Sequence, residues 1–213
     1  MTPGKELLFC ALGEVYAERA GLVNVGLEGM MLCGAFAGVI GSHYSGSPWI
    51  GALVGMIAAI GVAAIQAGVS INLSGDQIVV GIALNLAVLG ITSFLARAIW
   101  EGGDVPKVDG FSDFAMPLLS DIPVLGPILF KQGALIYVAL VVAVASWWIL
   151  TRTSWGLRLR SCGEDPRAAD SLGISVFAYR WKSMIICGAL AGLGGVFLSL
   201  GQLFTFSDNM SGG

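Results

Sequence analysis

Charged residues are scarce in this chain of 213 residues: only 12% are Asp, Glu, Lys or Arg, and there is a single histidine. The net charge of −3 provides no overall basic field, so we exclude nucleic-acid binding from the expected functions. The four cysteines, Cys10, Cys33, Cys162 and Cys187, lie far apart and form no CxxC pair. Their spacing predicts neither a disulfide framework nor a zinc site.

Sequence motifs of the common enzyme classes are absent as well. The chain contains no GxSxG nucleophile elbow, no HExxH zinc motif and no GxxxxGK(S/T) phosphate-binding loop. We therefore expect a chain that is not an enzyme and that holds no metal or cofactor of its own. If ATP powers its activity, ATP and Mg²⁺ are bound by a separate chain.

Apolar residues dominate instead, at 56% of the chain, and the mean hydropathy is +0.83. These values lie outside the range of soluble domains and predict a membrane protein. Because about 20 mainly apolar residues cross a bilayer core of about 30 Å, four clear spans are expected, at 48–71, 77–99, 133–151 and 183–206. Residues 27–45 form a weaker fifth span, and residues 5–17 form a shorter candidate for a sixth. The predicted fold is an all-α polytopic transmembrane bundle, a single domain over 1–213.

Positive charge is concentrated in one connection of the predicted bundle. The stretch 152–182 holds six of the eleven Lys and Arg residues. Loops that stay in the cytoplasm are enriched in these residues, so this connection is predicted to face inward and the acidic connection 101–132 outward. The tryptophans are divided in the same way. Trp49 and Trp100 are predicted to lie at the outer interface, and Trp147, Trp148, Trp155 and Trp181 near the inner one. The chain is therefore expected to cross the membrane several times, with the 152–182 connection on the inside.

Glycines spaced four residues apart recur in the predicted spans: Gly34 and Gly38, Gly51 and Gly55, Gly188 and Gly192. Such pairs allow helix backbones to approach closely in lipid, where packing is a main source of helix association. With 31 glycines in the chain, any single pair can also arise by chance. Together the pairs predict a tight bundle, and the GLGG sequence at 192–195 predicts a locally weakened helix that could flex.

Uncharged polar residues inside the spans are the candidates for a solute pathway. Polar groups are costly in hydrocarbon and tend to face a pathway or a partner helix. The candidates are Gln66, Asn85, Ser93 and Gln202. Their lack of charge favours a neutral hydrogen-bonding solute, although the same amides can serve only to join neighbouring helices. The rings of Phe197, Phe204 and Phe206 would suit a base or a sugar, unless they face lipid.

The segment GEDPRAADSLG at 163–173 is unusually charged for this chain. Asp165 suits an N-cap, Pro166 suits the first helical position, and Gly173 suits a left-handed helix end. The pattern predicts a helix of about two turns, roughly 10 Å long.

The predicted helix at 163–173 has two interpretations. Its apolar contacts would come from Ala168, Ala169 and Leu172, flanked by the charges of Arg167 and Asp170. Such a surface either fits a groove on a cytosolic partner or belongs to a solvated connector.

Three quoted stretches give the chain a family resemblance. RAADSLG at 167–173 resembles the coupling loop of ABC-importer permeases, although Arg167 replaces the glutamate that usually precedes the alanines. ERAGLVNVGLEGMMLCGAFAG at 18–38 resembles the signature of permeases in the simple-sugar and nucleoside branch of the ribose/branched-chain amino acid importer superfamily. DQIVVGIALNL at 76–86 and TSWGLRLRSCGEDPRAADSLGI at 153–174 resemble that branch at the same relative places.

The resemblance implies the membrane permease subunit of an ATP-driven importer, with a nucleoside or simple sugar as solute. It also implies a bacterial-type cytoplasmic (inner) membrane as the location. Its implied partners are cytosolic ABC ATPase subunits, a second permease subunit, an extracytoplasmic solute-binding protein and the lipid bilayer. The loop at about 152–182 would couple to the ATPase through Glu164, Asp165, Pro166, Arg167, Ala168, Ala169, Asp170, Leu172 and Gly173. Asn24 and Glu28 would lie near a break between helices close to the pathway. Phe204 is a further candidate for the pathway because of its aromatic ring.

Members of that branch continue beyond the equivalent of FSDNMSGG. We therefore expect this chain to be a C-terminally truncated fragment, or else a short gene product that lacks part of the pathway wall. Two further hypotheses belong to other classes. A stand-alone secondary transporter or channel would work without an ATPase, but no charged coupling residue lies in the clear spans. A membrane fragment without transport activity would bind the ATPase and move no solute.

Overall fold

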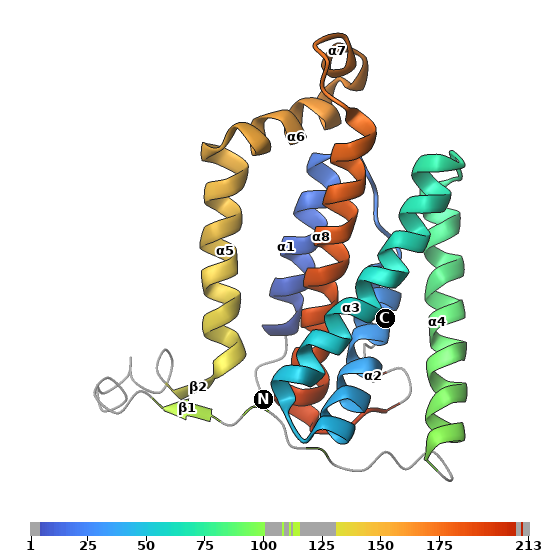
Figure 1. Ribbon diagram of the computed structural model, residues 1–213, viewed down its shortest axis with the longest axis vertical. Helices are drawn as coiled ribbons and strands as arrows, with labels where there is room; N and C mark the ends of the chain where they lie inside the picture. Colours follow the sequence, from blue (N-terminus) through green and yellow to red (C-terminus); the bar gives the residue numbers. More distant parts are fainter. Residues whose placement is uncertain are drawn as a thin grey trace.

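A computed structural model of the protein describes residues 5–100, 108, 111, 113–115, 131–207 and 210, and shows an elongated helical bundle (Figure 1). Its long helices are α1 (Lys5–Arg19), α2 (Leu27–Ser45), α3 (Pro48–Ala67), α4 (Gln77–Ile99), α5 (Ala134–Arg152) and α8 (Val176–Val196). Two of them continue into π-helical stretches, α3 into η1 (Gly68–Asn72) and α8 into η4 (Phe197–Leu203). The predicted all-α helical fold is confirmed.

Shorter elements lie at the two ends of the bundle. One end carries α6 (Ser154–Glu164) and α7 (Pro166–Ser171), and the other carries two antiparallel strands, β1 (Asp113–Ala115) and β2 (Lys131–Gly133). The strands are a small addition that the all-α prediction did not include. In register, Phe114 of β1 lies opposite Gln132 of β2.

Among the described residues, three or four stretches are able to cross a membrane, compared with the five predicted for the chain. By length and composition, three described stretches qualify alone, namely Pro48–Asn72, Gln77–Ile99 and Val176–Leu203. A fourth arises if Ile136–Arg152 and Ser154–Glu164, which meet at a bend of 73°, count as one span. The weaker predicted span at 27–45 does form α2, but Glu28 in its first turn and His43 in its last lower its hydropathy. The candidate at 5–17 forms α1, which has 15 residues.

Ring and side-chain contacts confirm which connections share an end of the bundle. Trp181 Nε1 donates a hydrogen bond of 2.9 Å to Asn72 Oδ1, so the α3–α4 connection lies at the same end as α6 and α7. At the opposite end, the rings of His43 and Trp100 lie 6.2 Å apart. These contacts agree with the predicted sorting of Trp181 and Trp100 to opposite ends, with the positively charged loop at the α7 end.

Close glycine contacts join α2, α3 and α8 into the centre of the bundle. A Cβ on Gly34 would lie 2.6 Å from Gly192 Cα, and a Cβ on Gly55 would lie 2.5 Å from the Gly34 oxygen. A Cβ on Gly195 would overlap the carbonyl of Met31. We call Gly34, Gly55, Gly192 and Gly195 the glycine seam, and it confirms the predicted tight packing. The GLGG sequence is part of continuous α8, and the helix becomes irregular only after it, at η4.

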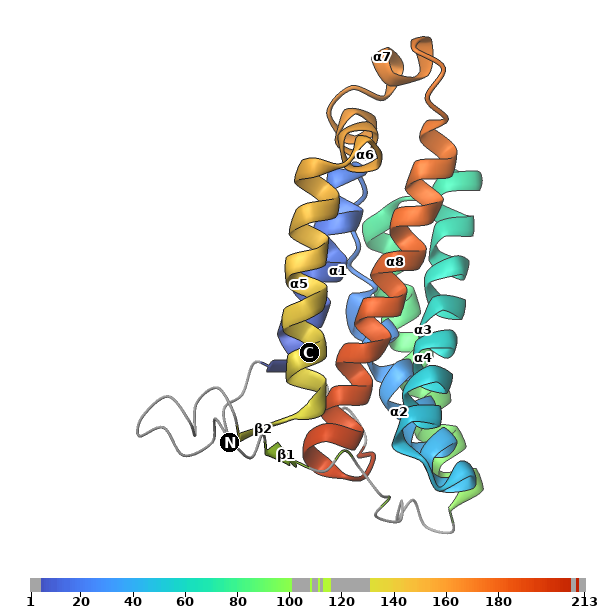
Figure 2. The same cartoon turned by 60° about the vertical axis from the view of Figure 1, so that its left-hand side comes forward.

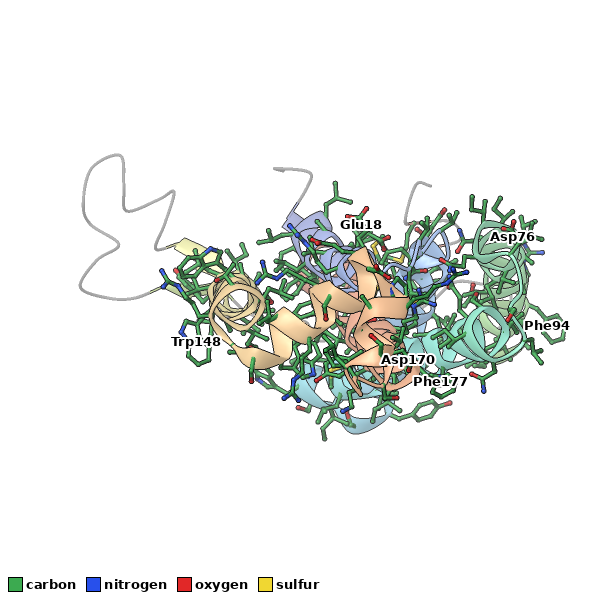
Figure 3. All side chains as sticks on the ribbon, turned by 90° about the horizontal axis from the view of Figure 1, so that it is seen from above. Glu18, Asp76, Phe94, Trp148, Asp170 and Phe177 are labelled. Carbon is green, nitrogen blue, oxygen red and sulfur yellow. The ribbon has the colours of Figure 1, made fainter. Side chains whose placement is uncertain are left out.

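The remaining helices lie around this centre. Figure 2 shows α5 beside α1, on the opposite side of the bundle from α4. Seen from the α7 end in Figure 3, Trp148 on α5 and Phe94 on α4 point outward at opposite edges of the molecule, and both side chains are exposed. The outer helices therefore present large apolar side chains to their surroundings.

Candidate functional site

The connection between α1 and α2 enters the bundle in an extended form. The Ala20 oxygen accepts a hydrogen bond of 3.3 Å from Arg180 Nε, and Asn24 Nδ2 donates one of 3.1 Å to Cys187 Sγ. Because Arg180 and Cys187 are seven residues apart on α8, the connection descends about 10 Å along that helix. As a result α2 begins inside the bundle, beside the middle of α8, because Cys187 is the twelfth of the 21 residues of that helix (Figure 1). Asn24 and Glu28 thus lie on either side of the start of α2.

Asn85 on α4 holds the first turn of α2 in place. Its Nδ2 donates a hydrogen bond of 2.9 Å to the Val25 oxygen, and its Oδ1 accepts one of 2.8 Å from the Gly29 nitrogen. Glycine makes the close approach possible, since a Cβ on Gly81 would lie 2.7 Å from the Gly26 nitrogen. The one amide of Asn85 satisfies two backbone groups at a helix start that has no side-chain cap of its own.

Gln66 on α3 completes a group of buried amides at this helix start. Its side chain is fully buried, and neither its Oε1 nor its Nε2 has a hydrogen-bond partner in the described part of the chain. The Oε1 faces Gly26, where a Cβ would collide with it. The Oδ1 of Asn24 is likewise buried without a partner. We call Asn24, Gln66 and Asn85 the amide cluster; it brings together three of the seven predicted pathway residues and holds free donors and acceptors.

The other predicted pathway residues lie apart from this cluster or beside it. Glu28 is half-buried in the first turn of α2, next to Gly29. Ser93 lies eight residues beyond Asn85 on α4 and is half-buried, whereas the neighbouring Thr92 is buried, with its hydroxyl donating to the Val88 oxygen at 2.8 Å. Gln202 and Phe204 lie within or just after η4, toward the opposite end of the bundle from α7.

The phenylalanines near the end of the chain are divided between core and surface. Phe197 and Phe206 are buried, and the rings of Phe36 and Phe206 lie 5.1 Å apart. Phe204 is 39% exposed and has a left-handed backbone with φ of 55°. The interpretation that all three rings face lipid is therefore wrong, because two of them pack inside the bundle.

Two contacts of the α1–α2 connection were missed from the sequence. Glu14 on α1 accepts a hydrogen bond of 3.1 Å from the Asn24 nitrogen, and Gln77 accepts one of 2.6 Å from the Val23 nitrogen. The signal for Glu14 was an acidic residue within the apolar stretch 5–17. No comparable signal marks Gln77, which lies at the first position of α4.

Helix α7 has the caps that the sequence predicts. Asp165 Oδ1 accepts hydrogen bonds from the nitrogens of Arg167 and Ala168, at 3.1 and 3.0 Å. The end of the helix is left-handed at Gly173, with φ of 77° and a bond of 2.9 Å from its nitrogen to the Asp170 oxygen. The predicted capped helix is confirmed.

The exposed face of α7 differs from the prediction at one residue. Ala169 is only 1% exposed, so it packs within the chain rather than projecting as a contact. Leu172 is 78% exposed, and Arg167, Ala168 and Asp170 are exposed beside it. The helix projects beyond α6 at the end of the molecule (Figure 1). A partner at this end would therefore meet Ala168 and Leu172, not Ala169.

The neighbouring helix α6 is joined tightly to α7. Asp165 ends α6 and also caps α7, because its nitrogen donates to the Ser161 oxygen at 3.1 Å while its carboxylate caps the next helix.

Burial raises the pKa of the Cys162 thiol on α6, and the Arg180 guanidinium offsets this only in part. Near neutral pH the thiol therefore stays protonated and poorly reactive.

Comparison with known proteins places these features in a family. Residues 4–212 match the family described as branched-chain amino acid transport system / permease component. The nucleoside ABC transporter permease protein of Lactococcus lactis is 42% identical over 89% of this chain and 62% of the relative. The guanosine ABC transporter permease protein of Bacillus subtilis is 40% identical over the same shares.

A further relative comes from an archaeon. The putative glucose ABC transporter permease protein of Haloferax volcanii is 36% identical over 91% of this chain and 59% of its own length. The chain thus spans about 60% of the length of these relatives. No solved structure matches it. Because the family match covers nearly every residue, the chain belongs to the permease-component family of the branched-chain amino acid transport system.

Proposed function

We propose that this chain is the membrane-spanning permease subunit of an ATP-binding-cassette importer that carries a nucleoside. The observation that carries the proposal is α7, a capped helix whose apolar tip projects from the positively charged end of the bundle. Family membership and the names of the relatives support the same class of transporter. Hydrolysis of ATP, with its Mg²⁺, belongs to a separate ATPase chain.

In this proposal α7 is the docking element for the ATPase. Leu172 and Ala168 would enter an apolar groove, and Arg167 and Asp170 would meet its rim. Movement of α7 would pass to α6 through the shared residue Asp165, and to α8, whose first turn is capped by Ser175. Because the glycine seam joins α8 to α2 and α3, these helices would move with it as a unit. The bundle would then switch access between the two sides of the membrane.

The amide cluster is the part of the pathway that we propose to contact the solute. Its unpaired amide atoms suit the hydroxyl, amide and ring-nitrogen groups of a neutral nucleoside. Two of the relatives are named for a nucleoside and for guanosine, and they are more similar to this chain than the relative named for glucose. A simple sugar is therefore the second choice of solute.

The proposed assembly has further parts. A second permease, either a copy of this chain or a related one, completes the pathway, and an extracytoplasmic binding protein delivers the solute. The complex lies in the cytoplasmic membrane, with α7 on the inside, as the charge of the 152–182 loop favours.

Reconstitution of the full permease tests this proposal. Proteoliposomes with the permease, its ATPase and its binding protein should take up radiolabelled guanosine only when ATP is supplied on the α7 side, and unlabelled guanosine should compete better than glucose. Uptake without any ATPase would instead indicate a secondary transporter or channel. ATPase binding without uptake of either solute would overturn the assignment as an importer.

A further inference from the structure

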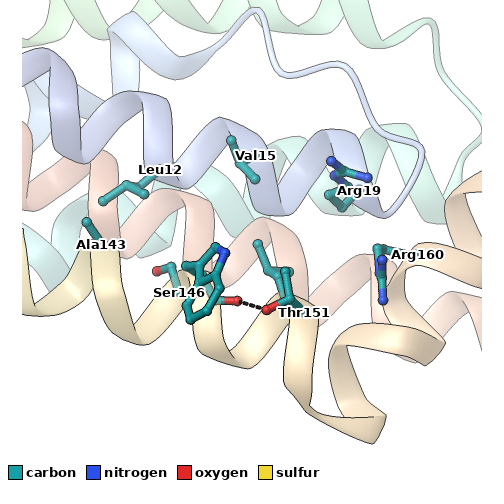
Figure 4. A pocket seen from close by; sticks show the side chains of 9 residues that line it. Leu12, Val15, Arg19, Ala143, Ser146, Thr151 and Arg160 are labelled. Carbon is teal, nitrogen blue, oxygen red and sulfur yellow. Dashed lines mark hydrogen bonds between the residues drawn. The ribbon is translucent and has the colours of Figure 1, made fainter.

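A cavity of about 260 Å³ lies between α1, α5 and α6, on the opposite side of α1 from the amide cluster. Figure 4 shows its lining, which consists of Leu12, Val15, Arg19, Ala143, Ser146, Trp147, Leu150, Thr151 and Arg160. None of these residues belongs to α7 or to the amide cluster. The cavity is therefore separate from both α7 and the amide cluster.

The deep part of the cavity is apolar. Leu12 and Val15 of α1 face Ala143 and Leu150 of α5 across it. The lining on α5 extends from Ala143 to Thr151, eight residues or about 12 Å along the helix axis. The space is thus elongated parallel to the helices, a shape that suits an extended hydrocarbon chain.

The end of the cavity near α6 is positively charged. Arg19, the last residue of α1, and Arg160 on α6 both line it, and no acidic residue does. The Nε of Arg160 is buried without a hydrogen-bond partner among the described residues. Arg160 is half-buried beside this apolar space and Arg19 is exposed next to it, so the lining is complementary to a negative charge.

The position of the cavity along the bundle fits a lipid of one leaflet. Trp147 lines the cavity and Trp148 follows it, and both side chains are more than half exposed near the end of α5. Tryptophan is enriched where membrane helices reach the headgroup level. Basic pockets between membrane helices on the cytoplasmic side bind acidic headgroups. The apolar part would then lie at acyl-chain depth and the arginines at phosphate depth.

We propose that this cavity binds an anionic phospholipid of the leaflet on the α7 side, with its phosphate between Arg19 and Arg160 and one acyl chain along Leu12, Val15 and Ala143. The bound lipid would fill the space between α1 and the bent α5–α6 pair. It would thereby tie α6, the helix that carries α7, to the rest of the bundle.

Lipid retention by the purified full permease tests the proposal. Native mass spectrometry after exchange into nanodiscs of phosphatidylcholine with a minor share of phosphatidylglycerol should show one retained phosphatidylglycerol. Arg19→Gln and Arg160→Gln should each weaken this retention about fivefold, since a basic side chain near an anionic headgroup contributes on that scale. Arg158→Gln, which changes an exposed arginine of α6 outside the cavity, is the matched control and should retain the lipid like the wild type.

A second variant separates lipid binding from a general effect of charge. Ala143→Phe fills the apolar part and leaves both arginines in place, so it too should lower phosphatidylglycerol retention. Equal retention of phosphatidylglycerol by the wild type and all variants would overturn the proposal. So would displacement of the lipid by inorganic phosphate alone, or cross-linking of Val15→Cys to a protein segment outside residues 1–213, because a protein segment would then occupy the cavity.

Discussion

Helices α4 and α8 are both apolar enough to cross a membrane, yet their surroundings differ. In the most apolar stretch of α8, 72% of the residues are buried inside the bundle, compared with 17% in α4. Gly188, Gly192 and Gly195 bring α8 close to its neighbours, whereas α4 turns large side chains such as Phe94 outward. Hydropathy therefore predicts which segments enter the membrane, while the placement of small residues predicts which helix lies inside the bundle.

Replacing a glycine of α8 with a large residue is expected to lower the stability of the bundle most. Gly195→Leu places a side chain against the carbonyl of Met31 and, 2.8 Å away, the Ala35 nitrogen. Backbone atoms cannot rotate aside, so we expect a cost of at least about 3 kcal/mol. The apparent Tm in detergent should fall by about 10 °C. Thermal unfolding followed by size-exclusion chromatography measures the change.

The matched control for this change is on α4. Gly90 has open space where a Cβ would lie, with no atom within 4 Å, so Gly90→Leu should leave the apparent Tm nearly unchanged. Equal losses of stability at positions 195 and 90 would contradict the contrast between the two helices.

The next largest effect is expected at Asn85, because its side chain links the outer helix α4 to the start of α2 by hydrogen bonds. Asn85→Leu removes the hydrogen bonds to the Val25 oxygen and the Gly29 nitrogen. We expect a loss of about 1–2 kcal/mol and a fall in apparent Tm of about 4 °C. The control is Ser93→Ala, at a half-buried position on the same helix. It should shift the apparent Tm by no more than about 1–2 °C, because substitutions away from packed or hydrogen-bonded features change stability by about 0.5 kcal/mol or less. If the Asn85 variant were as stable as the control, the two bonds would not hold α4.

Gln66 differs from Asn85 because it is buried without a hydrogen-bond partner among the described residues. Gln66→Leu exchanges a buried amide with two unpaired atoms for an apolar side chain, so stability should stay the same or rise. If the amide contacts the solute, ATP-dependent guanosine uptake should nevertheless fall, by about tenfold for one lost polar contact. Unchanged uptake in a stable variant would remove Gln66 from the pathway.

The smallest effect is expected on the outer face of α4. Phe94 is 71% exposed, and Phe94→Ala should change the free energy of unfolding by less than about 0.5 kcal/mol. A larger loss, measured by the same thermal assay in detergent, would show that this face is covered by a protein partner in the assembled transporter.

Much of the fold could be predicted from local sequence. The lengths of the apolar stretches predicted the bounds of α2 and α4. Asp165, Pro166 and Gly173 predicted the start and the end of α7. The depth at which α2 begins could not be predicted, because it depends on Asn24 meeting Cys187, a residue 163 positions away. The burial of Ala169 could not be predicted either, because a six-residue helix has no periodic pattern that distinguishes its buried side.

The candidate site was predicted only in part. Gln66 and Asn85 were identified because amides are unusual within apolar spans, and the structure brings both to the start of α2. Ser93 satisfied the same criterion, but its position on α4 places it about 12 Å along the helix from Asn85. Composition identifies polar residues in a span, whereas only the arrangement of helices shows which of them meet.

Site-specific cross-linking from α7 tests whether this helix docks on the ATPase. A cysteine introduced as Leu172→Cys lies at the exposed tip, while native Cys10, Cys162 and Cys187 are buried and Cys33 is half-buried. In the assembled transporter, a thiol cross-linker should join position 172 to the ATPase. Leu73→Cys, equally exposed at the same end, should give little product. Cross-linking from 73 but not from 172 would contradict the assignment of α7 as the docking element.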